Sequence, residues 1–117
     1  MINKVILIGH LTADPEVRAT PKGVYVGNMR LATNTYAGKD EAGNSKEHTE
    51  FHRLVVFGRQ AEIAGEYLRK GRLLYVEGRL QTNSWDDATA GVKKYRTEVI
   101  VDTFQMVGPK PQEEVAA

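Results

Sequence analysis

The sequence predicts a mostly β domain with one helix, and three observations support this prediction. Short apolar runs with alternating character, typical of half-buried strands, recur along the 117 residues. Clusters of Gly, Pro and Asp separate these runs as turns. Helical spacing of apolar residues is convincing in one segment only, residues 59–70. The resulting order of three strands, a helix and two strands is that of an OB-fold, a five-stranded Greek-key barrel with its helix between strands 3 and 4.

The first strand is expected over residues 4–11. It contains the apolar run 5–8, which is far too short to cross a membrane and lacks a signal-peptide cleavage site of small residues. The segment 12–15 ends the strand with turn residues, because Pro15 cannot donate to a strand ladder. We therefore interpret the beginning of the chain as a buried strand.

The second and third strands are expected over residues 24–33 and 49–57. A Pro-Lys-Gly turn at residues 21–23 precedes the second strand. Gly38 and Gly43 interrupt the polar segment between the two strands, which is long for a hairpin loop. This segment is expected either to project from the domain or to contribute to function.

The helix is expected over residues 59–70, with Lys70 in its last turn and Gly71 at the C′ position. Four side chains recur there at helical spacing: Ala61, Ala64, Tyr67 and Leu68.

The last two strands are expected over residues 73–85 and 94–106, joined by a polar turn around Asp86, Asp87 and Gly91. Residues 108–117 contain two prolines and are mostly polar, so we expect a short disordered tail. The organisation that follows is one domain over residues 1–107 and a tail over 108–117.

Composition narrows the function classes. The sequence contains no cysteine, which excludes disulfides, thiolate metal ligands and cysteine nucleophiles, and is compatible with a reducing cytoplasm. The formal net charge is only +1, so a polyanionic ligand would have to meet a local arrangement of Lys and Arg.

The segment 49–59 is the most informative of the chain, because as a strand it has two chemically different faces. One face carries Phe51, Arg53, Val55, Phe57 and Arg59, and the other carries Glu50, His52, Leu54 and Val56. Aromatic rings interleaved with arginines supply stacking planes and cations together, which suits single-stranded nucleic acid. The alternative is that Phe51 and Phe57 are core residues and that the arginines extend over apolar surface to water.

Several sequence blocks carry a resemblance that goes beyond the order of elements. They are NKVILIGHL at 3–11, DPEVR at 14–18, FHRLVVFGRQAEIA at 51–64, EYLRKG at 66–71 and YVEGRLQT at 75–82. In these blocks, which run in register from about residue 3 to 102, the chain resembles the bacterial-type single-stranded DNA-binding proteins (SSB). The resemblance implies sequence-independent binding and protection of single-stranded DNA during replication, recombination and repair.

The resemblance also implies which rings stack on bases. The family positions fall on Phe51, Phe57 and Trp85, and Trp85 sits at a polar strand end where a core tryptophan would be less natural. A fourth position matches Tyr36 only after a one-residue shift, because Ala37 aligns directly. Many relatives have tryptophan at the Phe51 position, so stacking there is expected to be weaker. Residues 81–84 are uncharged, whereas the family is often basic there.

Phosphate contacts are expected from cations within or beside the matched strands: Lys4, Arg18, Arg53, Arg59 and Arg79. Any one of them could instead be a solvated surface charge.

Catalysis and cofactors are not expected. His48 and His52 would lie about 13 Å apart on a strand, which is too far to share one metal ion, and His10 is isolated. Asp86 and Asp87 are interpreted as turn residues, and neither serine, Ser45 or Ser84, has a recognisable base. We therefore expect neither a metal site nor an enzyme.

The resemblance implies a homotetramer that acts in the cytoplasm on the nucleoid. The apolar first strand could pair with its copy, and the positions of His52 and Tyr75 resemble family positions near subunit contacts. Relatives that recruit replication and repair enzymes usually end in an acidic tip that closes on Phe. This sequence ends in EEVAA at 113–117, so weak recruitment of such partners is expected. Two other functions remain open at this point: an RNA-binding OB module, and a structural OB subunit that binds no nucleic acid.

Overall fold

The computed structural model describes residues 1–109 as a mostly β structure with one helix, as predicted. Its elements are β1 (Val5–Leu11), β2 (Glu16–Ala19), β3 (Tyr25–Lys39), β4 (Ser45–Phe57), α1 (Arg59–Tyr67), β5 (Leu73–Asp87) and β6 (Val92–Met106). The count of five strands was one too low, because β2 forms as a short strand of four residues against β3. Residues 110–117, which include most of the expected tail and its acidic pair, lie outside the described part.

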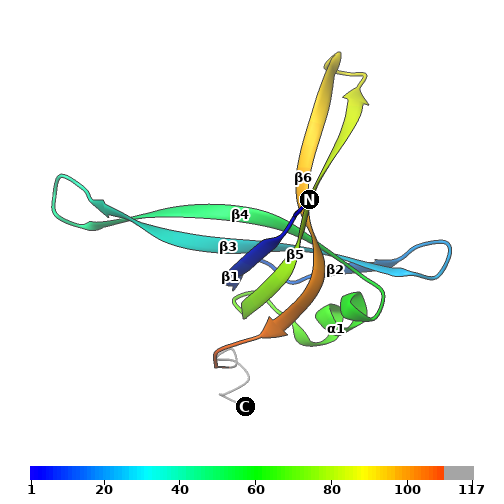
Figure 1. Cartoon of the computed structure of the whole chain (residues 1–117), viewed down its shortest axis with the longest axis horizontal. Helices are drawn as coiled ribbons and strands as arrows, with labels where there is room; N and C mark the ends of the chain where they lie inside the picture. Colours follow the sequence, from blue (N-terminus) through cyan, green and yellow to red (C-terminus); the bar gives the residue numbers. More distant parts are fainter. Residues whose placement is uncertain (110–117) are drawn as a thin grey trace.

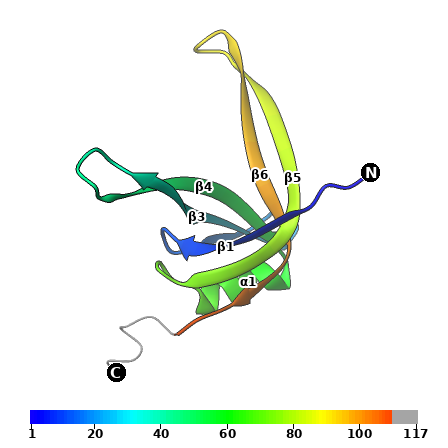
Figure 2. The ribbon, with the colours of Figure 1, turned by 60° about the vertical axis from the view of Figure 1, so that its left-hand side comes forward.

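The six strands form one sheet in the order β1-β5-β6-β4-β3-β2, and β1 pairs in addition with β3. This additional pairing consists of His10 with Ala32 and Leu11 with Leu31. All pairings are antiparallel except that of β4 with β6. The sheet therefore curls until β1, at one edge, reaches β3, the strand next to the other edge, and α1 packs against β2, β3 and β4 (Figures 1 and 2).

Two long hairpins project from the curled sheet, β3–β4 and β5–β6 (Figure 1). In the first, the strands stay paired as far as Tyr36 with Glu47, and a register shift precedes the last pair. The segment expected as a long loop is therefore mostly strand, and it projects. Its turn is closed by Asp40, whose Oδ1 accepts the Asn44 N–H at 2.9 Å.

Asp86, which was expected in the turn, is instead paired with Lys93 inside the β5–β6 ladder. Asp87, the last residue of β5, does close the turn of the hairpin with its side chain. Its Oδ1 accepts the backbone N–H groups of Thr89 at 3.0 Å and Ala90 at 3.1 Å. These bonds satisfy turn donors that no strand partner reaches.

The core lies inside the curled sheet and beneath α1. It includes Leu31 and Leu54 from the sheet and Ala61, Ala64 and Leu68 from the helical segment, all of them fully buried. Tyr67, by contrast, is 59% exposed.

The helix ends earlier than predicted. It stops at Tyr67, because Leu68 adopts an extended conformation (φ −93°, ψ 140°) while its side chain stays in the core. Gly71 does have a positive φ of 92°, but it lies beyond the helix, and its N–H donates to the carbonyl of Leu11 at 2.8 Å. In residues 1–109, no helix has the length and apolar character needed to span a membrane.

Candidate nucleic-acid interface

Strand β4 has the two faces that its sequence predicted. Leu54 and Val56 are fully buried, whereas Phe51 is 62% exposed and Phe57 is 47% exposed. This burial pattern excludes the alternative in which both phenylalanines belong to the core. Val55, between them, is buried although it lies on the outer side, at the point where β4 pairs with Ile100 of β6.

The register of β3 widens this outer side into a surface. Side chains that stand directly opposite one another on antiparallel strands point to the same side of the sheet. The pairs are Val26 with Phe57, Asn28 with Val55, Arg30 with Arg53 and Ala32 with Phe51. On the next strand, Arg18 of β2 stands opposite Val26. We call this surface the β4 face, defined by Phe51, Arg53 and Phe57 of β4, Asn28 and Arg30 of β3, and Arg18 of β2.

Tyr36 extends the β4 face along the β3–β4 hairpin. Side chains alternate along a strand, so Tyr36 points to the same side as Ala32, the residue opposite Phe51. In a regular strand the neighbouring Ala37 would point to the other side. Tyr36 is 63% exposed, so its ring is open to water on the side of the β4 face.

Trp85 lies on the β5–β6 hairpin and is 42% exposed. Alternation connects it with the β4 face: Ile100 stands opposite Val55 on β4 and opposite Arg79 on β5, and Trp85 points to the same side as Arg79. The guanidinium of Arg96 lies 5.4 Å from the centroid of the indole ring, within range of a cation–π interaction.

The positive charge that residues 81–84 lack comes from the facing strand. Lys94 stands opposite Trp85 and Arg96 stands opposite Asn83, so both point to the tryptophan side of the hairpin. Sequence reasoning missed these two residues and Arg30. They are identified by which residues stand opposite one another on neighbouring strands. This register cannot be read from composition or from the spacing of residues along one strand.

The five predicted phosphate contacts do not share one environment. Three of them form ion pairs within the chain: Lys4 with Glu77 at 2.9 Å, Arg59 with Glu62 at 3.4 Å and Arg79 with Asp102 at 3.4 Å. Within residues 1–109, Arg18 and Arg53 form no ion pair. Both belong to the β4 face.

Lys4 lies apart from the β4 face. It directly precedes β1, which pairs with β5 and β3 but not with β4. The hydrogen bond to Glu77 raises the pKa of Lys4 and lowers the pKa of the Glu77 carboxyl group. This ion pair and the place of β1 make Lys4 the least suited of the five to a shared contact with Arg53.

The histidines each have a local partner. His48 Nε2 lies 2.7 Å from Glu50 Oε1, and His52 Nε2 lies 2.9 Å from Thr33 Oγ1. In the described part of the chain, no three His, Cys, Asp or Glu side chains are grouped so that they could hold a metal ion.

A curled sheet whose outer side exposes aromatic rings beside arginines defines the class of OB-type proteins that bind single-stranded nucleic acid. The family model described as "Single-strand binding protein family" matches residues 2–107. The chain belongs to this family.

Individual relatives agree with the family match. The chain is 53% identical over 109 residues to "Single-stranded DNA-binding protein 1" of Chlorobaculum tepidum, covering 93% of this chain and 67% of the relative. It is similar to the Plasmodium falciparum SSB solved in complex with ssDNA, with a TM-score of 0.81, 30% identity, and coverage of 92% of this chain and 97% of that one. A deletion mutant of the single-stranded DNA binding protein from Thermus aquaticus gives a TM-score of 0.76 at 38% identity, with coverage of 92% and 51%.

Proposed function

We propose that this chain binds single-stranded DNA without regard to sequence, by stacking bases on exposed aromatic rings and contacting phosphates with Lys and Arg. Family membership supports the class of ligand. One observation carries the mechanism: Phe51 and Phe57 are exposed on the side of Arg53, while Leu54 and Val56 between them are fully buried. Exposed aromatic rings can stack on flat bases, and the neighbouring cations can bind phosphates, so this surface suits single-stranded nucleic acid.

This chemistry explains why sequence would not matter. Every nucleotide carries a phosphate and a base with a flat face, and the residues of the β4 face address both. Each stacked base contributes roughly 1–3 kcal/mol, judged by alanine substitution in other proteins. Duplex DNA hides the faces of its bases, so the same surface discriminates against it. The rings that we assign to stacking are Tyr36, Phe51, Phe57 and Trp85.

We infer in addition that the five long strands form the Greek-key barrel of an OB domain over residues 1–107, with β2 added at its edge. The ring of pairings β1-β5-β6-β4-β3 and back to β1 supports this assignment. The biological role that we assign, protection of single strands during replication, recombination and repair in the cytoplasm, rests on the family.

The first test uses Trp85, which is the only tryptophan in the sequence. Oligo-dT is titrated into the protein at low and high salt while the indole fluorescence is followed. We expect strong quenching that weakens as salt rises, because a base stacks on the ring and phosphate binding releases counterions. Duplex DNA should quench little, and oligo-U of the same length should bind less tightly than oligo-dT. Tighter binding of oligo-U would favour an RNA-binding module, and no binding at low salt would favour a structural subunit.

We propose that copies of the chain meet along β1 and form a homotetramer. Among residues 1–109, β1 is paired with β5 along most of its length but with β3 only at His10 and Leu11, so most of that edge is open. Its outer side exposes Ile6 (58%) and Ile8 (56%). Residues that the family resemblance associates with subunit contacts lie close by. Tyr75 stands directly opposite Ile8.

His52 lies near the junction of β1 with β3. It contacts Thr33, and the methyl group of Thr33 would lie 3.1 Å from a Cβ atom built at Gly9 of β1. His52 therefore lies close to β1, whose edge we assign to the subunit interface.

The double variant Ile6→Glu, Ile8→Glu should lower the oligomeric state. Burying an isoleucine contributes roughly 1.5–3 kcal/mol, and each subunit would lose two such contacts and gain charges at the interface. The measurement is molar mass by light scattering coupled to size exclusion, with circular dichroism to check the fold. Val92→Glu, at a valine that is 52% exposed on the distant hairpin, is the matched control. An unchanged mass for a folded double variant would place the interface elsewhere.

A further inference from the structure

Two arginines stand side by side on the β4 face. Arg30 of β3 is directly opposite Arg53 of β4, a position in which Cβ atoms lie about 5 Å apart. Both side chains are exposed, and neither forms an ion pair within residues 1–109. Like charges directly opposite on adjacent strands destabilise a sheet. The pair therefore carries a repulsion that an anion between the two guanidinium groups would relieve.

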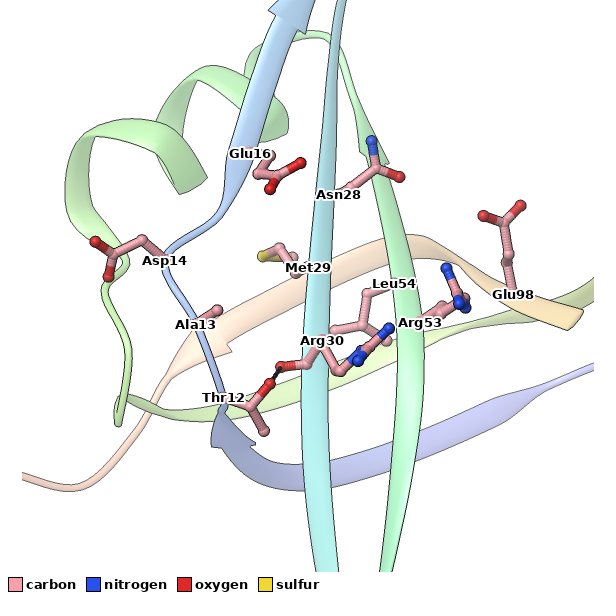
Figure 3. A pocket seen from close by; sticks show the side chains of 10 residues that line it. All are labelled: Thr12, Ala13, Asp14, Glu16, Asn28, Met29, Arg30, Arg53, Leu54 and Glu98. Carbon is pink, nitrogen blue, oxygen red and sulfur yellow. Dashed lines mark hydrogen bonds between the residues drawn. The ribbon is translucent and has the colours of Figure 1, made fainter. Parts of the chain in front are cut away.

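The pair lies at a recess of about 480 Å³. Figure 3 shows the guanidinium groups of Arg30 and Arg53 next to each other, with Glu98 beyond Arg53 and with Asp14 and Glu16 farther away. Two of these carboxylates already accept hydrogen bonds: Asp14 from the Lys70 N–H at 2.8 Å, and Glu98 from Asn83 at 3.1 Å. The carboxylates lie at the other parts of the recess, so the arginine end is the part that suits an anion.

The backbone under Arg30 is held in place. Its carbonyl oxygen accepts the backbone N–H of Thr12 at 3.0 Å and lies 3.4 Å from Thr12 Oγ1. Arg53 lies on the strand next to it, in the long paired segment of β3 and β4. The two guanidinium groups are thus presented from a fixed backbone, which lowers the entropic cost of binding one ligand with both.

We propose that Arg30 and Arg53 form a two-arginine seat for one phosphate of the bound strand, between the bases that stack on Phe51 and Phe57. The proposal rests on the proposed function and adds Arg30 to it. Arg53 lies between the two phenylalanines on β4, and Arg30 lies beside it, so the seat falls along the line that a strand stacked on both rings would follow. Guanidinium groups suit this role because their donors form fork-shaped contacts with phosphate oxygens.

The test is a salt titration with oligo-dT of about 8 nucleotides, short enough for one OB domain. It compares the wild type with Arg30→Ala, Arg53→Ala and the double variant, using Trp85 quenching. Each single variant should bind about tenfold more weakly, because a charged hydrogen-bond partner is lost. In single strands the slope of log K against log salt is about −0.7 for each neutralised phosphate. If both arginines serve one phosphate, the double variant should lose about 0.7 of slope, whereas two separate phosphates would cost about 1.4.

Two controls show whether the effect is local to the seat and independent of folding. Lys22→Ala removes one charge in the turn 20–23, at the far end of the β2–β3 hairpin (Figure 1), and should leave the slope unchanged. The thermal midpoint of Arg30→Ala should not fall, since a like-charge repulsion is removed; Arg30→Gln serves if the alanine variant does not fold. A slope loss near 1.4, or an unchanged slope and affinity in Arg30→Ala, would overturn the seat. If the wild type itself does not bind oligo-dT, the proposed function fails instead.

Discussion

Replacing Gly78 with alanine should destabilise the fold by about 3 kcal/mol or more, without touching any residue assigned to DNA binding. A Cβ atom at Gly78 would lie 2.3 Å from the carbonyl oxygen of Ile100 and 3.0 Å from its carbonyl carbon. These are backbone atoms of the neighbouring strand, so no side-chain rotation can remove the clash. The register of β5 against β6 shifts between Glu77 and Gly78. The glycine therefore permits the close approach at which β5 leaves β1 and continues into the projecting hairpin.

The free energy of unfolding in urea measures this effect. Gly9→Ala is a second variant of the same kind, since its Cβ would lie 2.2 Å from the Ala32 carbonyl oxygen at the β1–β3 junction. Gly43→Asn is the control, because Gly43 has φ 86° with no atom near the added Cβ, and asparagine tolerates that conformation. It should cost about 1 kcal/mol or less. Wild-type stability in Gly78→Ala would mean that the strands separate there at little cost.

Local patterns along the chain predicted much of the fold. The alternation in β4 correctly assigned Leu54 and Val56 to the core and left Phe51 and Phe57 in water. The helical spacing of Ala61, Ala64 and Leu68 likewise identified core residues. In each case burial on one side of the element imposes a period that is visible in the sequence.

The missed features depend on pairing between strands. β2 is short and lies between two prolines, so its four residues show no usable alternation, and only its ladder with β3 makes it a strand. The ends of the two long hairpins are mostly exposed on both sides, because no core lies beneath them, so burial imposes no alternation there. Their strand character comes from backbone hydrogen bonds. Register also decides that Arg30 faces Arg53 and that Arg96 lies over Trp85, and no single strand encodes either fact.

The double variant Phe57→Ala, Trp85→Ala should lose more DNA affinity than any other change considered. Each ring removed should cost roughly 1–3 kcal/mol, or about 5- to 150-fold in the dissociation constant for oligo-dT. The two residues lie on different strands, β4 and β5, so their effects should approximately add, to about 2–6 kcal/mol. Fluorescence anisotropy of labelled oligo-dT is the measurement, because the tryptophan signal is lost in this variant. The salt slope should change little, since no phosphate contact is removed.

Tyr95→Ala is the matched control for the stacking rings. Tyr95 is 68% exposed on the same hairpin as Trp85, but it stands opposite Ser84 and so points to the other side. If stacking is confined to the side of the β4 face, this variant should bind like the wild type. In the opposite direction, Phe51→Trp enlarges the flat surface of a ring that is 62% exposed and should tighten binding severalfold. A loss of affinity in Tyr95→Ala as large as that in Trp85→Ala would mean that DNA contacts both sides of the hairpin. Unchanged affinity in the double variant would show that phosphate contacts alone hold the strand.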